Sequence, residues 1–435
     1  MMSTDAMVDG AARPTNRRRI IAAMLFVSVV INYLDRSNIS IAGPHLAGAL
    51  HLDPVQMGLV FSGFGWSYAA LQVPTGWVVD RVEPRLLYAA ALALWSVATM
   101  SLGLAGSFAV LFALRVAVGV CEAPAFPVNN RIATTWFGER QRAGVIGFYT
   151  SGQFVGLAFL APVLTWLDAH YGWEAVFVIT GLVGLVWAVI WYAAYRDPVD
   201  FPGANAAEVA LIAEGGGIPD LGRRLAERRA PFRWADLALV LSSRKLWGIY
   251  IGQFGLNCTA WFFLTWFPTY LVHYRHMDFI RAGFYAAIPF LAAFLGSLSG
   301  GFVSDLLLRR GASLGMARKL PIIAGLLLST VIVGANYVQS PALVVAFLTV
   351  AFFANGFASI TWSLVSALAP ERLIGLTGGV FNLCGNLAAI AVPIVIGLLV
   401  SGDDFTLPML FVAGTALLGA LSYIVLVGKV ERLAG

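Results

Sequence analysis

The sequence predicts an all-α membrane protein with twelve transmembrane helices in two six-helix bundles. Three observations carry this prediction. The 435 residues are 59% hydrophobic and only 12% charged, whereas soluble domains carry about twice that share of charge. Apolar runs long enough to cross a bilayer recur along the chain, and one polar segment divides them into two groups of six. This composition excludes a soluble enzyme, a disordered chain and a nucleic-acid-binding protein.

Each apolar run of about 18 or more residues is interpreted as one membrane span, with glycine, proline and charge clusters as boundaries. The expected spans are residues 20–40, 55–79, 86–105, 108–130, 143–166, 174–195, 246–270, 282–304, 319–337, 342–368, 374–400 and 406–428. The chain is therefore expected to divide into a tail (1–19), an N-terminal bundle (20–195), a linker (196–245), a C-terminal bundle (246–428) and a second tail (429–435).

The positions of the basic residues predict the orientation of the chain in the membrane. Most of the 28 lysines and arginines lie in alternate loops, on the same side as both termini, whereas Arg275 and Arg281 lie on the opposite side. Because basic residues concentrate in cytoplasmic loops, both termini and the linker are expected to be cytoplasmic. The net charge of +5 then reflects topology in a lipid bilayer and indicates no nucleic-acid partner.

A weak internal repeat relates the two predicted bundles. Gly76 to Arg81 follows the second span, and Gly301 to Asp305 closes the eighth, so each motif has the same place in its half. Two six-helix halves related in this way are typical of secondary transporters, which bind substrate between the halves near mid-membrane.

Four charged residues fall deep within predicted spans: Asp35, Arg36, Arg115 and Glu122. Each costs roughly 2.5 to 3.5 kcal/mol on insertion scales, so these groups must be paired, hydrated or functional. One interpretation is that salt bridges clamp the first and fourth spans together. The other is that an arginine binds a substrate anion through its forked donors while a carboxyl group carries a proton. The second interpretation couples an anion to a proton.

Other polar side chains within the spans could complete the site of a hydroxylated ligand, although individually such a residue more often forms a helix–helix hydrogen bond than a ligand contact. They are Tyr33, Tyr68, Gln153, Gln253, Asn257, Ser359, Thr361, Trp362, Asn382 and Asn386. All five histidines, His45 among them, are placed in outer loops, so no metal site or cofactor is expected. The sequence has no phosphate-binding loop, which favours an ion gradient over ATP as the energy source.

The motifs resemble the major facilitator superfamily and, within it, the anion:cation symporters. The resemblance spans nearly all of residues 17–430 and is carried by Asn32 to Arg36, the Gly76 to Arg85 loop, Arg115 to Pro127 and Asn130 to Phe137. The stretch from Gly147 to Phe159 is most similar to bacterial D-galactonate carriers.

The resemblance implies roles for individual residues. Arg36 binds the substrate carboxylate, and Asp35, Glu122 and Arg115 take part in proton coupling. Further implied substrate contacts are Tyr33, Tyr68, Gln153, Ser359, Thr361, Trp362 and Asn382. Asp80, Arg81 and Asp305 belong to gating loops on the cytoplasmic side.

The resulting expectation is a proton-coupled importer of a sugar-acid anion, D-galactonate or a similar aldonate, that works as a monomer by alternating access. The first loop is short and has no glycosylation motif, which favours a bacterial inner membrane over the membranes of animal relatives. The alternatives are a symporter for another organic anion (a hexuronate, an aldarate or an aromatic acid), a receptor that does not translocate, and a membrane-embedded enzyme. No nucleophile–base pair in the spans supports the enzyme.

Overall fold

The computed structural model describes residues 13–79, 81–220, 234–370, 373–402 and 404–433. In the first half of the chain the helices are α1 (Arg18–Ala49), α2 (Pro54–Val79), α3 (Pro84–Leu102), α4 (Phe108–Glu122), α5 (Ala125–Trp136), α6 (Glu139–Tyr171) and α7 (Trp173–Ala194). The connecting segment contains η1 (Pro198–Asp200), α8 (Ala206–Glu214) and α10 (Trp234–Ser242). The described residues contain no β-sheet.

The second half is also helical, with several spans built from two or more consecutive pieces. They are α11 (Arg244–Thr265), α12 (Phe267–Thr269), the π-helix η2 (Tyr270–Tyr274), α13 (Phe279–Arg309), α14 (Leu314–Ser329), η3 (Thr330–Asn336), α15 (Pro341–Ala358), η4 (Ser359–Thr361), α16 (Trp362–Leu368), α17 (Ile374–Asn386), α18 (Ala388–Leu399) and α19 (Thr406–Val425).

Ten helices within the described residues are long and apolar enough to cross a membrane, by length and composition. The other two predicted spans correspond to α2 and α11, with 26 and 22 residues. Polar residues inside them, Gln72 in α2 and Gln253 and Asn257 in α11, lower their mean hydropathy. The twelve-span, all-α fold class predicted from the sequence is confirmed.

Local sequence signals fix where many of these helices begin. Pro84 and Pro341 occupy the first positions of α3 and α15, where the missing N–H of proline has no helical partner to lose. Asp278 accepts a hydrogen bond from Arg281 N (3.0 Å) and caps α13, and Ser313 accepts one from Met316 N (3.2 Å) and caps α14. Such caps satisfy backbone donors that the helix itself leaves unpaired.

The burial pattern is the reverse of that of a soluble protein. Large apolar side chains lie on the exterior, including Val189 at 69% and Phe302 at 67% exposure. Arg115 and Glu122, in contrast, are buried at 2% and 0%. An apolar exterior around a polar interior is what a hydrocarbon solvent selects, so this chain is a multi-pass membrane protein.

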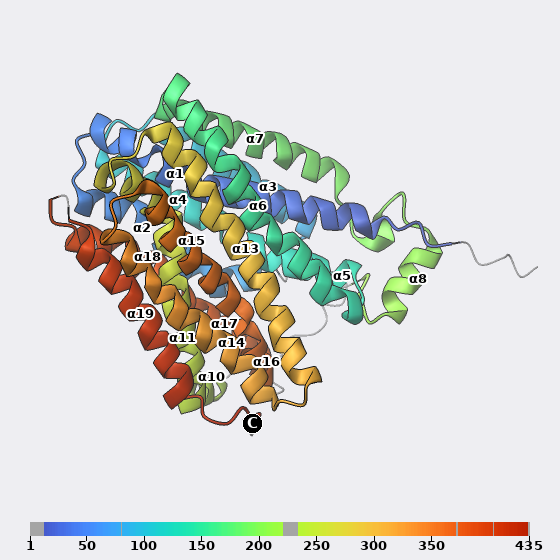
Figure 1. Ribbon diagram of the computed structural model, residues 1–435. Coiled ribbons are helices and arrows are strands. Elements are labelled where there is room, and N and C mark those ends of the chain that lie inside the picture. Colours follow the sequence, from blue (N-terminus) through green and yellow to red (C-terminus); the bar gives the residue numbers. More distant parts are fainter. Residues whose placement is uncertain (1–12, 80, 221–233, 371–372, 403, 434–435) are drawn as a thin grey trace, which may run out of the picture.

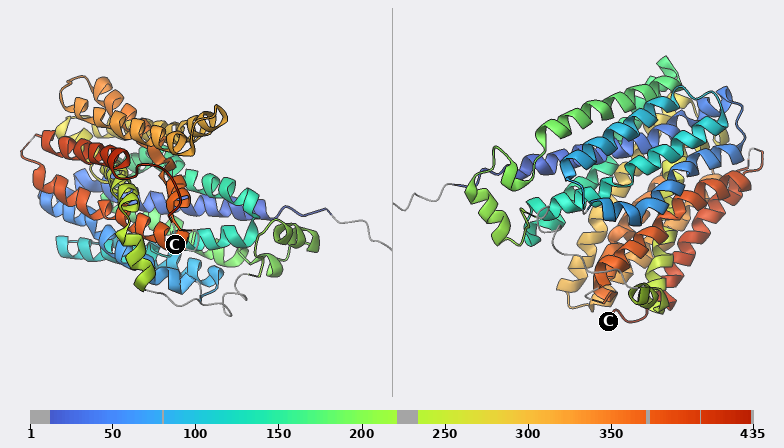
Figure 2. Two further views of the ribbon diagram at one scale, coloured as in Figure 1. Left: turned by 90° about the horizontal axis from the view of Figure 1, so that it is seen from below. Right: turned by 180° about the vertical axis from the view of Figure 1, so that it is seen from behind.

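The two halves form separate helix bundles that meet at one end (Figures 1 and 2). We call this the contact end; here α1 ends and α2 begins. The helices diverge toward the opposite end, the terminal end, where α1 begins and α19 ends. Between the halves, α2 packs on α18 and α6 packs on α13. These two helix pairs make most of the contact between the bundles, and α1 adds smaller contacts with α11 and α12.

Glycine and aromatic side chains make the close contacts between the halves. A Cβ on Gly58 of α2 would lie 2.4 Å from the carbonyl oxygen of Pro393 in α18, a separation that only glycine permits. Phe61 packs edge-to-face on Trp266, with ring centroids 5.4 Å apart, and Trp266 Nε1 donates to Pro393 O at 3.1 Å. These groups hold the contact end closed in this structure.

Helix α1 is longer than the span predicted from the sequence. It continues through Pro44 to Ala49, so the placement of His45 in an outer loop was wrong. His45 Nδ1 lies 2.8 Å from Asp168 Oδ1 of α6, and its ring lies 4.4 Å from the ring of Phe279 in the other half. These partners from other helices extend α1 beyond the apolar run.

Candidate functional site

Arg36 and Glu122 form an ion pair in the interior of the first half. Arg36 Nε lies 2.5 Å from Glu122 Oε1, with the side chains 6% and 0% exposed. Glu122 is the last residue of α4, and Pro124 separates α4 from α5. Proline cannot donate the next backbone hydrogen bond, so the carboxylate lies at an interruption in the span.

Four aromatic rings surround the Arg36 guanidinium, and we call them the aromatic cage. Arg36 Cζ lies 5.0, 4.9, 4.8 and 5.9 Å from the ring centroids of Tyr33, Phe64, Tyr68 and Phe126. Aromatic faces attract a cation within about 6 Å, and more strongly away from water. The cage therefore stabilises the positive charge while leaving guanidinium donors available for a second acceptor.

The cage depends on a close approach of α2 to α4. A Cβ on Gly119 would lie 2.3 Å from Ser67 Oγ and 2.4 Å from Phe64 O. Ser67 Oγ also donates to Val116 O at 2.7 Å. Because glycine brings the two helices together, Phe64 and Tyr68 of α2 reach the same volume as Glu122 of α4.

Asp35 and Arg115 lie in the same interior but do not pair. Asp35 Oδ2 accepts a hydrogen bond from Trp95 Nε1 of α3 at 2.9 Å. Arg115 Cζ lies 5.5 Å from the Phe64 ring centroid, and its Nε and Nη1 have no hydrogen-bond acceptor among the described residues. Of two possible clamps between α1 and α4, only Arg36–Glu122 forms, so Arg115 is a buried cation with unused donors.

The second half contributes a chain of amides and hydroxyls. Thr361 Oγ1 donates to Gln253 Oε1 at 2.8 Å, and Gln253 Nε2 donates to Asn257 Oδ1 at 3.4 Å. Asn382 Nδ2 donates to Gln72 Oε1 of α2 at 3.4 Å and so links the two halves. These groups are uncharged, and they suit the hydroxylated part of a ligand.

The remaining predicted ligand contacts lie at varied positions. Gln153 on α6 and Ser359 in η4 are half-buried. Trp362, at the start of α16, is 49% exposed and packs edge-to-face on Phe381 at 4.9 Å. Tyr33 and Tyr68 belong to the aromatic cage in the first half, whereas Trp362 packs on another residue of the second half.

Two of the three predicted gating residues, Arg81 and Asp305, lie at the terminal end of the helices. Asp80 falls outside the described residues, and Arg81 lies in the turn between α2 and α3. Asp305 of α13 pairs with Arg318 of α14 at 3.2 Å. Arg131 of α5 donates to the carbonyl oxygens of Val79 and Val82.

Sequence reasoning missed Phe64, Phe126, Trp95 and Gln72. Phe64 lies one helical turn before Tyr68, and the same-face spacing is a signal that could have found it. Phe126 follows Glu122 by four residues, but the break at Pro124 lies between them. Gln72 lies one helical turn after Tyr68 and is polar, so the same spacing could have found it. Trp95 carries no such signal, because its partner Asp35 belongs to another helix.

The fold and the site define a two-bundle membrane carrier with a buried, charged interior. The Major Facilitator Superfamily sequence model matches residues 25–393, and the chain belongs to this family. It is 50% identical to the D-galactonate transporter of Escherichia coli O6:H1 (strain CFT073), over 97% of this chain and 98% of that transporter.

Two further similarities extend this result. A probable galactarate/D-glucarate transporter of Bacillus subtilis (strain 168) is 41% identical, with 98% of this chain and 95% of that protein covered. The crystal structure of a D-xylose–proton symporter superposes with a TM-score of 0.72 at 15% identity, covering 95% of this chain and 99% of the other. The latter similarity shows the fold alone.

Proposed function

We propose that this protein is a proton-coupled symporter that imports a sugar-acid anion, D-galactonate or a similar aldonate, by alternating access. The observation that carries the proposal is the Arg36–Glu122 pair inside the aromatic cage. The 50% identity to a D-galactonate transporter supports the choice of substrate. As a membrane carrier in this family, the chain is not an enzyme.

Competition between two carboxylates explains the coupling. Glu122 neutralises the charge of Arg36 as long as it is ionised, through a contact with Nε. When a proton neutralises Glu122, the guanidinium needs another anion, because an unpaired buried charge is strongly unfavourable. A substrate carboxylate then takes the place of Glu122. The net charge of the site stays the same, since one proton and one anion enter together.

Asp35 is the second proposed proton carrier, and Arg115 is proposed to hold the charge balance around it. Both are buried, at 1% and 2% exposure. The polar groups of the second half, among them Thr361 and Asn382, are proposed to contact the substrate hydroxyls. In this proposal the first half binds the carboxylate and the protons, and the second half binds the sugar hydroxyls.

We further propose that the chain is a monomer of the bacterial inner membrane with both termini in the cytoplasm. The excess of basic residues on the side of the termini supports this orientation. With this orientation the contact end faces outward, and the helices diverge toward the cytoplasm (Figure 1). The structure is then an inward-facing state.

The test replaces Glu122 by glutamine in protein reconstituted into liposomes. A gradient of one pH unit supports about tenfold accumulation for each proton carried. We expect Glu122→Gln to lose uptake driven by the pH gradient but to retain exchange of labelled for unlabelled galactonate. Glu174→Gln is the matched control, because Glu174 is exposed at the start of α7. Unchanged gradient-driven uptake in Glu122→Gln would exclude the coupling role.

Arg115 favours one alternative, a dicarboxylate such as galactarate. Its unused Nε and Nη1 groups are available to donate to a second carboxylate, and the Bacillus subtilis relative is named for galactarate and D-glucarate. Competition of unlabelled galactarate, glucuronate and galactonate against labelled galactonate uptake distinguishes the candidates. We expect galactonate to compete best; tighter competition by galactarate would favour the dicarboxylate.

A further inference from the structure

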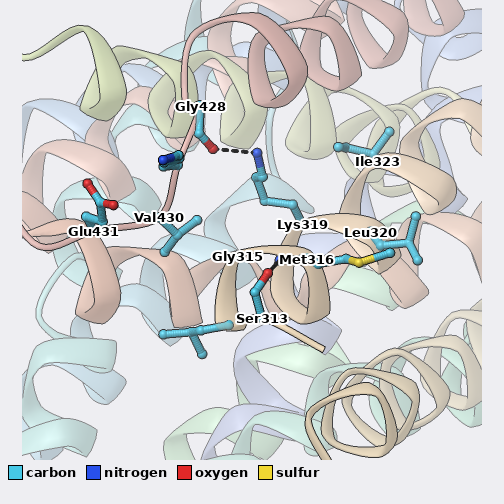
Figure 3. Close-up of a pocket in the computed structure, with 11 residues that line it drawn as sticks. Ser313, Gly315, Met316, Lys319, Leu320, Ile323, Gly428, Val430 and Glu431 are labelled. Carbon is cyan, nitrogen blue, oxygen red and sulfur yellow. Dashed lines mark hydrogen bonds between the residues drawn. The ribbon is translucent and has the colours of Figure 1, made fainter. Parts of the chain in front are cut away.

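A pocket lies at the terminal end of the second half, away from the charged residues of the first half. It has a volume of about 570 Å³ and is formed by the first turns of α14 and the segment that follows α19 (Figure 3). Helix α14 starts a candidate membrane span, Leu314–Asn336, and α19 ends one, Thr406–Val425. The pocket is therefore at the level where a bilayer changes from hydrocarbon to headgroups.

The charges that line this pocket are mainly lysines. The lysines of this arginine-rich chain are Lys245, Lys319 and Lys429, and the last two line the pocket together with one acid, Glu431. Lys319 Nζ donates to Gly428 O at 2.6 Å (Figure 3), which leaves two of its three N–H donors for another acceptor. A lysine ammonium is a compact charge that suits a phosphate group.

One part of the pocket wall is apolar and exposed. Leu314, Met316 and Leu320 are 46%, 56% and 46% exposed, and all three belong to α14. A free phosphate ion has no interaction with such side chains, whereas an acyl chain buries them and gains about 0.8 kcal/mol per CH₂ group. The pocket wall therefore combines two lysine ammonium groups with an apolar surface that an acyl chain can cover.

We propose that this pocket binds one anionic phospholipid. Its phosphate lies beside Lys319 and Lys429, and an acyl chain runs along Leu314, Met316 and Leu320. Basic pockets between membrane helices are sites of this kind of recognition. Because the pocket walls come from α14 and from the segment after α19, the lipid also connects these two elements.

Bound lipid is expected to stabilise the terminal end of the second half. The segment after α19 already reaches α16, where Leu433 N donates to Leu368 O at 2.9 Å and Arg432 donates to Ser366 O at 3.2 Å. A lipid held by Lys319 and Lys429 adds a further connection from α14 to this segment. The site is separate from Arg36 and Glu122, so the inference does not depend on the proposed substrate.

The experiment measures lipid binding to the purified full-length protein in detergent by native mass spectrometry. Phosphatidylglycerol, phosphatidylcholine and inorganic phosphate are titrated separately. We expect one tight phosphatidylglycerol site in the wild-type protein. Lys319→Gln and Lys429→Gln should each weaken binding about fivefold, and the double variant about 25-fold. Lys245→Gln is the matched control and should bind as wild type. Paired Lys→Arg changes should retain most of the binding.

Three outcomes would overturn the proposal. Equal affinity for phosphatidylglycerol and phosphatidylcholine would remove the role of charge. Inorganic phosphate binding as tightly as phosphatidylglycerol would remove the role of the apolar wall. Retention of the tight site in the double Lys→Gln variant would place it elsewhere. Thermal unfolding in detergent without added lipid checks that each variant is folded, so that loss of binding is not loss of structure.

Discussion

At the residue scale, Arg36 combines two interactions that lysine could not reproduce. Its Nε contacts Glu122 at 2.5 Å, while its planar guanidinium faces the rings of the aromatic cage. The fork lets one cation bind an acid of the protein at one edge and present further donors elsewhere. This geometry is what an exchange of carboxylates requires, because the incoming anion needs donors before the outgoing one has left.

Replacement of Arg36 tests this reading. We expect Arg36→Ala to reduce galactonate affinity by at least 30-fold, since a charge-assisted bidentate contact is lost and Glu122 loses its partner. Arg36→Lys should recover only part of the affinity, because the fork is absent. Isothermal titration calorimetry measures both, with Arg310→Ala, an exposed arginine at the end of α13, as control. Near-normal affinity in Arg36→Ala would remove Arg36 from the site.

The sequence predicted the charged members of this site better than the apolar ones. Asp35, Arg36, Arg115 and Glu122 are recognisable because a charge inside an apolar run is costly. Their pairing could not be predicted, since it depends on the relative rotation of α1, α3 and α4. Trp95 illustrates this point: it is an ordinary apolar-run residue until α3 packs beside α1 and its indole N–H reaches Asp35.

At the element scale, helix α1 is capped by a residue far along the chain. Arg17, the residue before α1, provides no side-chain cap. Glu208 of α8 instead accepts hydrogen bonds from the backbone N–H groups of Arg17 and Arg18, each at 3.0 Å, and from Thr15 Oγ1. The sequence indicated a solvated linker here, and it could not predict the docking because 190 residues separate Glu208 from Arg18.

This cap makes part of the stability dependent on pH. Burial alone would raise the pKa of Glu208, but the hydrogen bonds from Thr15, Arg18 and Arg17 outweigh it and lower the pKa below its ordinary value. A carboxyl group whose pKa is lower in the folded state stabilises the fold above its unfolded pKa of about 4.3. The stabilisation is lost as the pH falls through the folded pKa.

We therefore expect Glu208→Gln to lower the thermal unfolding temperature at pH 7, by an amount that corresponds to about 1 kcal/mol for a helix cap. The difference from wild type should persist down to about pH 5 and shrink at lower pH, where both side chains are neutral. Differential scanning fluorimetry in detergent measures the effect. Glu214→Gln, at the other end of α8, is the control; a difference that does not change with pH would show that the carboxylate charge is irrelevant.

At the scale of the whole molecule, the predicted two-bundle plan is present, but no pattern in the sequence indicated where the bundles touch. The contact end is closed mainly by α2 on α18 and by α6 on α13. At the first pair Gly58 faces Pro393, and at the second a Cβ on Gly283 would lie 2.3 Å from Thr165 Oγ1. Alternating access requires these contacts to separate while others form at the terminal end. Glycine at the contact surface thus determines how stable one of the two states is.

Adding one methyl group at Gly58 should shift the balance between these states. In Gly58→Ala the new Cβ would be placed 2.4 Å from a backbone oxygen, which cannot rotate away, so the closed contact end becomes strained. A state with an open contact end would not contain this strained contact, so we expect the ligand-free population to shift toward it. The readout is the rate at which a maleimide labels Thr165→Cys in protein whose native cysteines are replaced by serine, because Thr165 is 3% exposed in the closed contact. We expect Gly58→Ala to raise that rate at least tenfold and to slow galactonate uptake.

The matched control is Gly48→Ala, whose added Cβ meets no atom within 4 Å; it should change neither the labelling rate nor the uptake. Equal labelling in both variants would mean that the contact between α2 and α18 does not control the equilibrium between the two states.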